Sequence, residues 1–273
     1  MKKFDGILIC TDLDGTLLKN DGTISRENID AIEYFKENGG RFTFVTGRMP
    51  YYAAEMYKAV NPNAPIGCIN GGGVYDYAAK QYLWTQPMPQ NVVELIKCVD
   101  DALANVGIQI CCFNNSRFLK DNETMVSFRE VTGLPYVVCD YNSIPDDIAK
   151  ILFGSEINDE ILAVEKMLKS HPLAENFDFV RSEKTLYEIL PKGIGKGVVL
   201  SKIAELLGID IEKTIAIGDY DNDISMFKTA KLGIAVENAC EAAKKAADFI
   251  TVSNEDHAIA QLISDLENGK YKI

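Results

Sequence analysis

The chain has 273 residues, of which 47% are apolar and 25% are charged, and this composition excludes a disordered or collagen-like protein. At roughly 100 to 200 residues per domain, the length allows one large domain or two smaller ones. The net charge of −12 would repel nucleic-acid phosphates and anionic lipid, so we expect neither nucleic acid nor a membrane as a partner.

The first predicted strand is the apolar run of residues 6–10, which leads into Asp12-Leu13-Asp14-Gly15-Thr16. An apolar run followed by carboxylates is typical of a buried parallel strand that presents reactive groups at its carboxyl end. In an extended chain, Asp12 and Asp14 leave on the same side and repel one another unless a cation or a proton lies between them. Because carboxylate oxygens suit Mg²⁺, the spacing favours a metal site. An ordinary turn with a helix cap is the simpler alternative.

Helices and strands alternate over the next sixty residues, which predicts parallel β-α-β units. The carboxyl ends of the strands, and the polar residues that follow them, should therefore share one edge of a sheet. The expected elements are a helix over residues 25–37 capped by Ser25, a strand over 41–45 followed by Thr46-Gly47-Arg48, a helix from Pro50, and a strand over 65–69 followed by Asn70-Gly71.

The pattern changes from about residue 84, where short elements are set among turn residues. We interpret residues 84–189 as an inserted α+β domain, and residues 1–83 and 190–273 as the two parts of a discontinuous α/β core. Expected in the insert are helices over 92–103 and 159–169 and strands over 108–113, 118–119, 150–153, 177–180 and 186–190. Expected in the second part of the core are helices over 196–207, through 226, from 239 and from 256, and strands over 214–217, 233–236 and 249–252.

A second acidic segment, Gly218-Asp219-Tyr220-Asp221-Asn222-Asp223, follows the predicted strand over residues 214–217. It repeats the arrangement of the first motif, in which carboxylates follow a buried strand. Two acidic strand ends on one sheet edge could bind one divalent cation together. An acidic turn is again the simpler alternative, although two such turns in one chain weaken it.

A calcium-binding loop is the more specific alternative for both acidic segments. Such a loop needs glycine at its sixth place and glutamate at its twelfth. The first segment has Leu17 and Thr23 at these places, and the second has Ile224 and Ala230. The calcium interpretation therefore fails for both.

A basic loop, Lys192-Gly193-Ile194-Gly195-Lys196-Gly197, precedes the helix expected from residue 196. It does not match a Walker loop, because Leu190 stands where glycine is required and Gly197 stands where serine or threonine is required. Alone, the loop indicates a solvated lysine. Beside a carboxylate and metal cluster, a lysine at the start of a helix could bind phosphate.

Taken together, these motifs resemble those of the haloacid dehalogenase superfamily. The segment from Asp12 to Thr16 is similar to its first motif, Thr46 to its second, Lys196 to its third, and the segment from Gly218 to Asp223 to its fourth. The Thr-Gly-Arg and Asn-Gly segments and the lysine loop resemble the Cof-type branch, subclass IIB. The resemblance implies a Rossmann-like core with a parallel sheet and an inserted α+β cap domain.

The resemblance also implies a phosphoric monoester hydrolase that hydrolyses small phosphorylated metabolites, above all sugar phosphates, through an aspartyl-phosphate. Asp12 would be the nucleophile and Asp14 the general acid and base. Mg²⁺ would be bound by Asp12, Asp14 and Asp219. Phosphate would be bound by Leu13, Thr46, Gly47, Arg48, Lys196 and Asn222, with Thr46 and Lys196 also catalytic and Asp223 and Asn70 in support.

Other functions stay open at this point. A phosphomutase of the same superfamily would return the phosphoryl group to a sugar, and a phosphatase could instead act on a phosphorylated cofactor such as pyridoxal phosphate or flavin mononucleotide. A binding protein without activity is a third alternative. The protein is expected to be a monomer or a homodimer.

Seven cysteines without a Cys-x-x-Cys pair are typical of free thiols in a reducing compartment. The residues near the amino terminus include too short an apolar run for a signal peptide, and no stretch reaches the length of a membrane span. We therefore expect a cytoplasmic protein.

Overall fold

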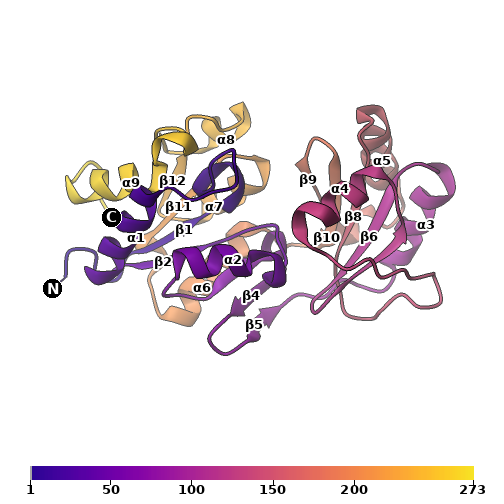
Figure 1. The fold of residues 1–273 in the computed structure, drawn as a ribbon, viewed down its shortest axis with the longest axis horizontal. Coiled ribbons are helices and arrows are strands. Elements are labelled where there is room, and N and C mark those ends of the chain that lie inside the picture. Colours follow the sequence, from indigo (N-terminus) through magenta and orange to yellow (C-terminus); the bar gives the residue numbers. More distant parts are fainter. Residues whose placement is uncertain (1) are drawn as a thin grey trace. The chain divides into compact units, whose positions relative to one another are not determined.

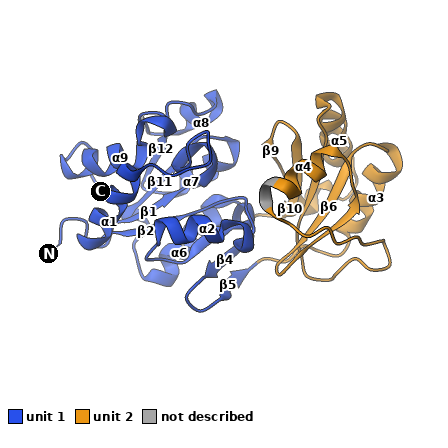
Figure 2. Cartoon of the chain, in the orientation of Figure 1, with its two compact units in different colours: residues 1–85, 195–273 blue, residues 86–194 orange. Residues whose placement is uncertain are grey.

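The computed structural model describes residues 2–273, apart from the side chains of residues 131 and 132. It forms two compact units, with residues 1–85 and 195–273 in unit 1 and residues 86–194 in unit 2 (Figures 1 and 2). The insert expected over residues 84–189 begins and ends slightly before unit 2. Its last strand continues to Pro191, which pairs with Phe177 inside the sheet of unit 2, and this pairing keeps the following residues with that unit.

Unit 1 is built on a five-stranded parallel sheet with the strand order β13-β12-β11-β1-β2 (Figure 1). Its central strand, β1, pairs with β11 on one side and with β2 on the other. Thr11, the last residue of β1, lies opposite Ile217 and Phe44, so the carboxyl ends of the three strands are level. The strands are β1 (Leu8–Thr11), β2 (Arg41–Phe44), β11 (Thr214–Gly218), β12 (Leu232–Ala235) and β13 (Phe249–Ile250).

The helices of unit 1 begin where the sequence predicts. Ser25 caps the first helix, since its Oγ accepts a hydrogen bond of 3.3 Å from the backbone nitrogen of Asn28. Pro50 occupies the first turn of the second helix. The helices are α1 (Arg26–Glu37), α2 (Pro50–Val60), α6 (Lys196–Leu207), α7 (Ile224–Thr229), α8 (Glu241–Ala246) and α9 (Ala258–Glu267).

The strand expected over residues 65–69 runs parallel to the neighbouring chain after β2, as predicted, but it joins the parallel sheet through an isolated bridge between Val45 and Gly67. It also forms an antiparallel three-stranded sheet with two later strands, which the sequence did not predict. The reason is a tight turn, because Ile69, Asn70 and Gly71 all have positive φ and reverse the chain. The three strands are β3 (Ile66–Cys68), β4 (Gly73–Asp76) and β5 (Gln81–Thr85).

Unit 2 contains a five-stranded antiparallel sheet with the order β7-β6-β8-β10-β9. The strands are β6 (Gly107–Cys112), β7 (Ser116–Lys120), β8 (Ile148–Gly154), β9 (Phe177–Glu183) and β10 (Leu186–Pro191). Two helices, α3 (Val92–Ala102) and α5 (Asn158–Ser170), contribute apolar residues to one core with this sheet. The expected strands and these two helices are confirmed, with ends shifted by a few residues.

One helix of unit 2, α4 (Glu123–Thr132), has no counterpart among the predicted elements. Its sequence does carry a signal for the start of a helix and a signal for its end. The Asn122 side chain accepts a hydrogen bond from the backbone nitrogen of Met125 at 2.9 Å, and Gly133 ends the helix in the left-handed conformation.

No helix within residues 2–273 is both long and apolar enough to cross a membrane.

Candidate active site

The residue after β1, Asp12, has an extended backbone and a buried side chain. The chain then enters a kinked helical turn, Leu13–Leu17, in which Asp14 keeps an extended conformation and Gly15 has a φ of 78°. Leu13 is fully buried, so only its backbone is left to contact a ligand. The turn separates the two carboxylates that the spacing alone placed together.

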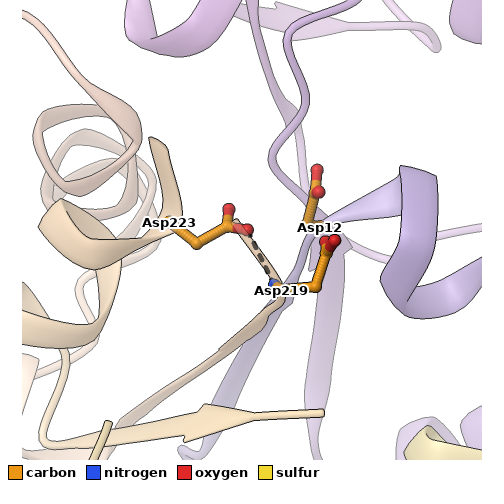
Figure 3. A group of neighbouring side chains, drawn as sticks. All are labelled: Asp12, Asp219 and Asp223. Carbon is orange, nitrogen blue, oxygen red and sulfur yellow. Dashed lines mark hydrogen bonds between the residues drawn. The ribbon is translucent and has the colours of Figure 1, made fainter. Parts of the chain in front are cut away.

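A cluster of three carboxylates lies at this strand end. Asp12, Asp219 and Asp223 each offer an oxygen within 4.8 Å of the others, and Figure 3 shows the side chains of Asp12 and Asp219 pointing to the same side. Asp219 directly follows β11, the neighbour of β1 in the parallel sheet. The expectation that two acidic strand ends meet at one sheet edge is therefore met by Asp12 and Asp219.

The Asp14 carboxylate takes no part in this cluster. It accepts two hydrogen bonds from the Arg48 guanidinium, one from Nε at 2.9 Å and one from Nη2 at 2.6 Å. Arg48 follows β2, the other neighbour of β1. The paired side chains are 56% and 31% exposed, so water can reach the Asp14 carboxylate.

Asp223 is fully buried and both of its oxygens are bonded. Its Oδ2 accepts hydrogen bonds from the backbone nitrogens of Asp219 at 2.9 Å and Tyr220 at 3.0 Å, the first of which is dashed in Figure 3. Its Oδ1 accepts a hydrogen bond from Lys196 Nζ at 2.6 Å. These bonds hold the loop after β11 in place, and they fit the supporting role expected of Asp223.

Lys196 begins α6, and its side chain is only 1% exposed. Its Nζ lies 2.7 Å from Oδ1 of Asp12 and 2.6 Å from Oδ1 of Asp223. Burial disfavours the ammonium, but the charges of the two carboxylates outweigh burial and raise the pKa of Lys196. The lysine therefore stays charged at neutral pH and bridges the two aspartates.

The charges of the cluster do not balance. When all three carboxylates are ionised they face one ammonium, so two negative charges lack a counter-charge inside the cluster unless a carboxyl is protonated or a cation binds. Burial and the neighbouring carboxylates hold the pKa of Asp12 well above its usual range, and burial together with Asp223 raises the pKa of Asp219 to about 6. A buried, oxygen-only donor set with a surplus of two negative charges fits a divalent cation such as Mg²⁺.

Thr46 is buried and lies two residues after β2, the neighbour of β1 in the parallel sheet. Its Oγ1 accepts a hydrogen bond from the backbone nitrogen of Arg48 at 3.1 Å, and its backbone carbonyl accepts one from Asn70 at 3.1 Å. The side chain of Asn70 lies against Gly47, where an added Cβ would stand 2.9 Å from Asn70 Oδ1. Asn222 donates from Nδ2 to the same Asn70 oxygen at 3.0 Å. The predicted supporting residue Asn70 thus links two loops of the site.

Two residues that orient the site were not assigned roles from the sequence. Thr16 Oγ1 donates a hydrogen bond of 2.9 Å to Oδ1 of Asp219, and Asn238 Nδ2 donates one of 2.8 Å to the backbone oxygen of Gly15. Thr16 lies in the first acidic motif, so its position in the sequence could have indicated a role in the site. Asn238 lies in the loop after β12, and its position beyond a strand end was the only signal that could have found it.

Comparisons with known proteins show what this chain is similar to. Residues 9–263 match the model of a family described as haloacid dehalogenase-like hydrolase. A 5-amino-6-(5-phospho-D-ribitylamino)uracil phosphatase of Bacillus subtilis is 30% identical, over 96% of this chain and 99% of that protein. A pyridoxal phosphate phosphatase of Escherichia coli is 31% identical, over 94% of this chain and 97% of that protein.

Among solved structures, a haloacid dehalogenase-like hydrolase from Bacteroides thetaiotaomicron superimposes with a TM-score of 0.82 at 28% identity, over 95% of this chain and 99% of that one. The family match covers most of the chain, and it contains the whole carboxylate and lysine cluster. The resemblance inferred from the motifs is thereby confirmed. The chain belongs to the haloacid dehalogenase-like hydrolases, and within that family it is a phosphoric monoester hydrolase.

Proposed function

We propose that this protein is a Mg²⁺-dependent phosphatase that hydrolyses small phosphomonoesters, above all sugar phosphates, through an aspartyl-phosphate on Asp12. The observation that carries the proposal is the contact of Lys196 with Asp12, in a cluster that keeps two negative charges in excess. A nucleophilic carboxylate beside a fixed ammonium suits attack on a phosphoryl group, because the ammonium offsets charge on the transferring oxygens.

In the first step, an oxygen of Asp12 forms a bond to phosphorus while the bond from phosphorus to the ester oxygen breaks. Asp14 gives its proton to the departing oxygen. In the second step, water attacks phosphorus, Asp14 takes the proton of the water, and the Asp12 carboxylate is released. The exposure of the Asp14 side chain supports this role, since a group that exchanges protons with substrate and water must be reachable.

The phosphoryl oxygens would be bound by Thr46, Lys196 and the backbone amides that follow Asp12 and Thr46, with Asn222 and Arg48 nearby. The carboxylates of Asp12 and Asp219 and the backbone carbonyl of Asp14 would hold Mg²⁺, whose charge would offset that of the phosphoryl oxygens. Asp223 would keep Lys196 and the loop of Asp219 in position through the hydrogen bonds described above.

A phosphorylated cofactor is the second candidate substrate class, and one observation favours it. The Escherichia coli relative is named a pyridoxal phosphate phosphatase and is as similar to this chain as the ribitylamino-uracil phosphatase of Bacillus subtilis. Both names describe small metabolites with one phosphate ester. We therefore propose small metabolites, in place of phosphoproteins or nucleic acids, as the substrate class.

The test is release of inorganic phosphate from a panel with Mg²⁺ present. The panel holds hexose and pentose phosphates, pyridoxal phosphate, flavin mononucleotide and one phosphopeptide. We expect the highest kcat/KM with a small metabolite. A higher kcat/KM with the phosphopeptide contradicts the proposed substrate class, and conversion of a sugar phosphate to its isomer without phosphate release indicates a mutase.

A further inference from the structure

Two asparagines from the far side of the parallel sheet reach back to the turn that carries Asp14. Asn238 lies in the loop after β12, and Asn254 lies in the loop after β13. The strand order places β12 and β13 beyond β11, on the side away from β2. Both asparagines nevertheless bond to the chain that follows β1, so their loops extend past the carboxyl end of β11.

The two asparagines hold two backbone carbonyls of the turn Leu13–Leu17 and the residue after it. Asn238 Nδ2 donates to the oxygen of Gly15 at 2.8 Å, and Asn254 Nδ2 donates to the oxygen of Leu18 at 2.9 Å. Carbonyls at the end of a helical turn have no partner within the turn, and a buried one needs a partner from elsewhere. Leu18 and Asn254 are both buried, so the Asn254 amide meets this need.

The two asparagines are also joined to one another. The backbone nitrogen of Asn254 donates to Oδ1 of Asn238 at 2.9 Å, and Ser253 Oγ donates to Oδ1 of Asn254 at 3.2 Å. Each side-chain oxygen therefore accepts while each side-chain nitrogen donates, and these partners fix the orientation of both amides. Asn238 and Asn254 thus form one connected network around the turn.

The loop that contains Asn238 also binds the second acidic segment. The backbone nitrogen of Cys240 donates to the backbone oxygen of Asp219 at 2.9 Å. One short loop therefore holds both the chain after β1 and the chain after β11. These two segments lie very close together, since an added Cβ at Gly15 would stand 2.6 Å from Oδ2 of Asp219. Any shift of this loop would change the separation of the two segments.

Stability alone does not account for the bond from Asn238 to Gly15. Asn238 is exposed, so water can bond the Gly15 oxygen when the amide is absent. Such a bond adds little to the free energy of unfolding, because folding exchanges a bond to water for a bond within the protein. What the amide adds over water is a fixed position for the carbonyl, since the network holds the amide itself in place.

We propose that Asn238 and Asn254 are positioning residues that fix the turn carrying Asp14 relative to Asp219. This inference rests on the proposed function, in which the Asp14 backbone carbonyl and the Asp219 carboxylate hold Mg²⁺. The two asparagines act through the backbone of the turn and not by contact with the ion. Removal of residues that orient metal ligands typically lowers metal affinity or activity by about 10- to 100-fold.

The first measurement is the unfolding temperature of the full-length protein as a function of Mg²⁺ concentration, without substrate. In EDTA, Asn238→Ala should unfold within about 2 °C of wild type, because exposed substitutions change stability little. It should need about tenfold more Mg²⁺ than wild type for the same rise in unfolding temperature. Asn254→Ala should show the same weaker response to Mg²⁺, and it should also unfold at a lower temperature in EDTA because it leaves the buried Leu18 carbonyl unbonded.

The second measurement is hydrolysis of p-nitrophenyl phosphate at saturating Mg²⁺. We expect kcat to fall about tenfold in Asn238→Ala while KM changes by no more than about twofold, because the change displaces Asp14 and leaves the lysine and threonine of the site in place. Asn20→Ala is the matched control. Asn20 is also exposed and its Oδ1 accepts a hydrogen bond from Asn254 Nδ2 at 3.3 Å, but it lies beyond the turn. This variant should match wild type in its Mg²⁺ response, kcat and KM.

The outcomes separate this inference from the function on which it rests. If wild type hydrolyses p-nitrophenyl phosphate but Asn238→Ala keeps the wild-type Mg²⁺ response and kcat, the positioning role is wrong and the phosphatase stands. If Asn20→Ala shows the same losses as Asn238→Ala, the bond to Gly15 is not their cause and the inference is again overturned.

Two further outcomes concern the proposed function itself. If wild type hydrolyses no phosphate but is stabilised by Mg²⁺, the proposed function fails, and a tenfold weaker response of Asn238→Ala to Mg²⁺ still supports the positioning role. If wild type neither hydrolyses phosphate nor responds to Mg²⁺, the proposed function fails and takes this inference with it.

Discussion

The ammonium of Lys196 lies 2.7 Å from Oδ1 of Asp12, and the two residues come from the two separate parts of the discontinuous core. Asp12 follows the first strand of the parallel sheet, whereas Lys196 begins the helix that follows the inserted unit 2. The site is therefore complete only when both parts of the discontinuous core have folded together.

Asp12→Asn should lower turnover by several orders of magnitude while the protein stays folded. The change removes the proposed nucleophile and one charge from the cluster, but Lys196 keeps its ion pair with Asp223. Phosphate release from p-nitrophenyl phosphate and far-ultraviolet circular dichroism measure the two effects. Asp14→Asn is the comparison, with an expected loss of about 10²- to 10⁴-fold from the missing proton transfer. Near-normal activity in Asp12→Asn would refute the covalent mechanism.

Lys196→Met should destabilise the metal-free protein by about 3 to 5 kcal/mol, because it leaves two buried carboxylates without their ammonium. Added Mg²⁺ should stabilise this variant more than it stabilises the wild type, since the ion would then offset a larger excess of negative charge. Thermal unfolding in EDTA and in Mg²⁺ provides the comparison. Lys202→Met, at an exposed site on the same helix, is the control and should differ little from wild type. An equal response of Lys196→Met and wild type to Mg²⁺ contradicts the proposed charge balance.

Removal of divalent ions with EDTA should abolish activity, and Mg²⁺ should restore it while Ca²⁺ should not. The donor set of Asp12 and Asp219 is carboxylate, and Mg²⁺ keeps a compact octahedral shell around such oxygens. Ca²⁺ takes more ligands at longer distances and would bring both oxygens of Asp12 onto the ion, which removes the free oxygen needed for attack. The measurement is the rate of phosphate release after dialysis against EDTA and after re-addition of each ion. Equal rates with Ca²⁺ would count against this arrangement.

The buried thiol of Cys111 should make the protein less stable at alkaline pH. Burial raises the pKa of Cys111 to about 11 from the usual 9.0. Between these two values the unfolded chain ionises this thiol and the folded chain does not. The stability that the neutral thiol contributes is therefore present below pH 9 and is lost as the pH rises towards 11.

Urea unfolding between pH 8 and pH 10.5 measures this loss for Cys111. We compare wild type with Cys111→Ala, in which the decline over this range should be smaller by about 1 kcal/mol or more. Identical slopes for Cys111→Ala and wild type would show that this thiol titrates alike in both states.

The strand ends of the active site were predictable because they depend on local patterns. Apolar runs followed by carboxylates placed Asp12 and Asp219 at one edge of a parallel sheet, and the structure brings them together. The basic loop placed Lys196 at the start of a helix, where the structure has it. In each case the burial of a short strand or the start of a helix was enough to position the residue.

The features that the sequence did not predict depend on tertiary contacts. The pairing of Asp14 with Arg48 joins residues on neighbouring strand ends, and nothing in their local patterns specifies it. The antiparallel turn from β3 into β4 follows from the left-handed backbone of Ile69, a β-branched residue that rarely adopts it. Side-chain packing around the site fixes both features, so spacing along the chain could not have revealed them.

Gly15→Ala should reduce activity much more than it reduces stability. Gly15 has a φ of 78°, and a Cβ there would stand 2.6 Å from Oδ2 of Asp219, closer than such atoms pack. The substitution should therefore displace the Asp219 carboxylate and weaken the binding of the metal. Gly22 is a matched control, because it has the same φ of 78° but no atom within 4 Å of the added carbon.

Both variants should lose about 1 to 2 kcal/mol of stability from the left-handed backbone alone, as measured by urea unfolding. The kcat/KM at saturating Mg²⁺ and the Mg²⁺ concentration that gives half-maximal activity then isolate the contact with Asp219. We expect Gly22→Ala to match the wild type in both kinetic measurements. Gly15→Ala should need more Mg²⁺ and turn over more slowly, because a displaced Asp219 holds the ion less well. If both variants keep wild-type kinetics and Mg²⁺ dependence, the position of Asp219 does not control metal binding, and the proposed metal site must be revised.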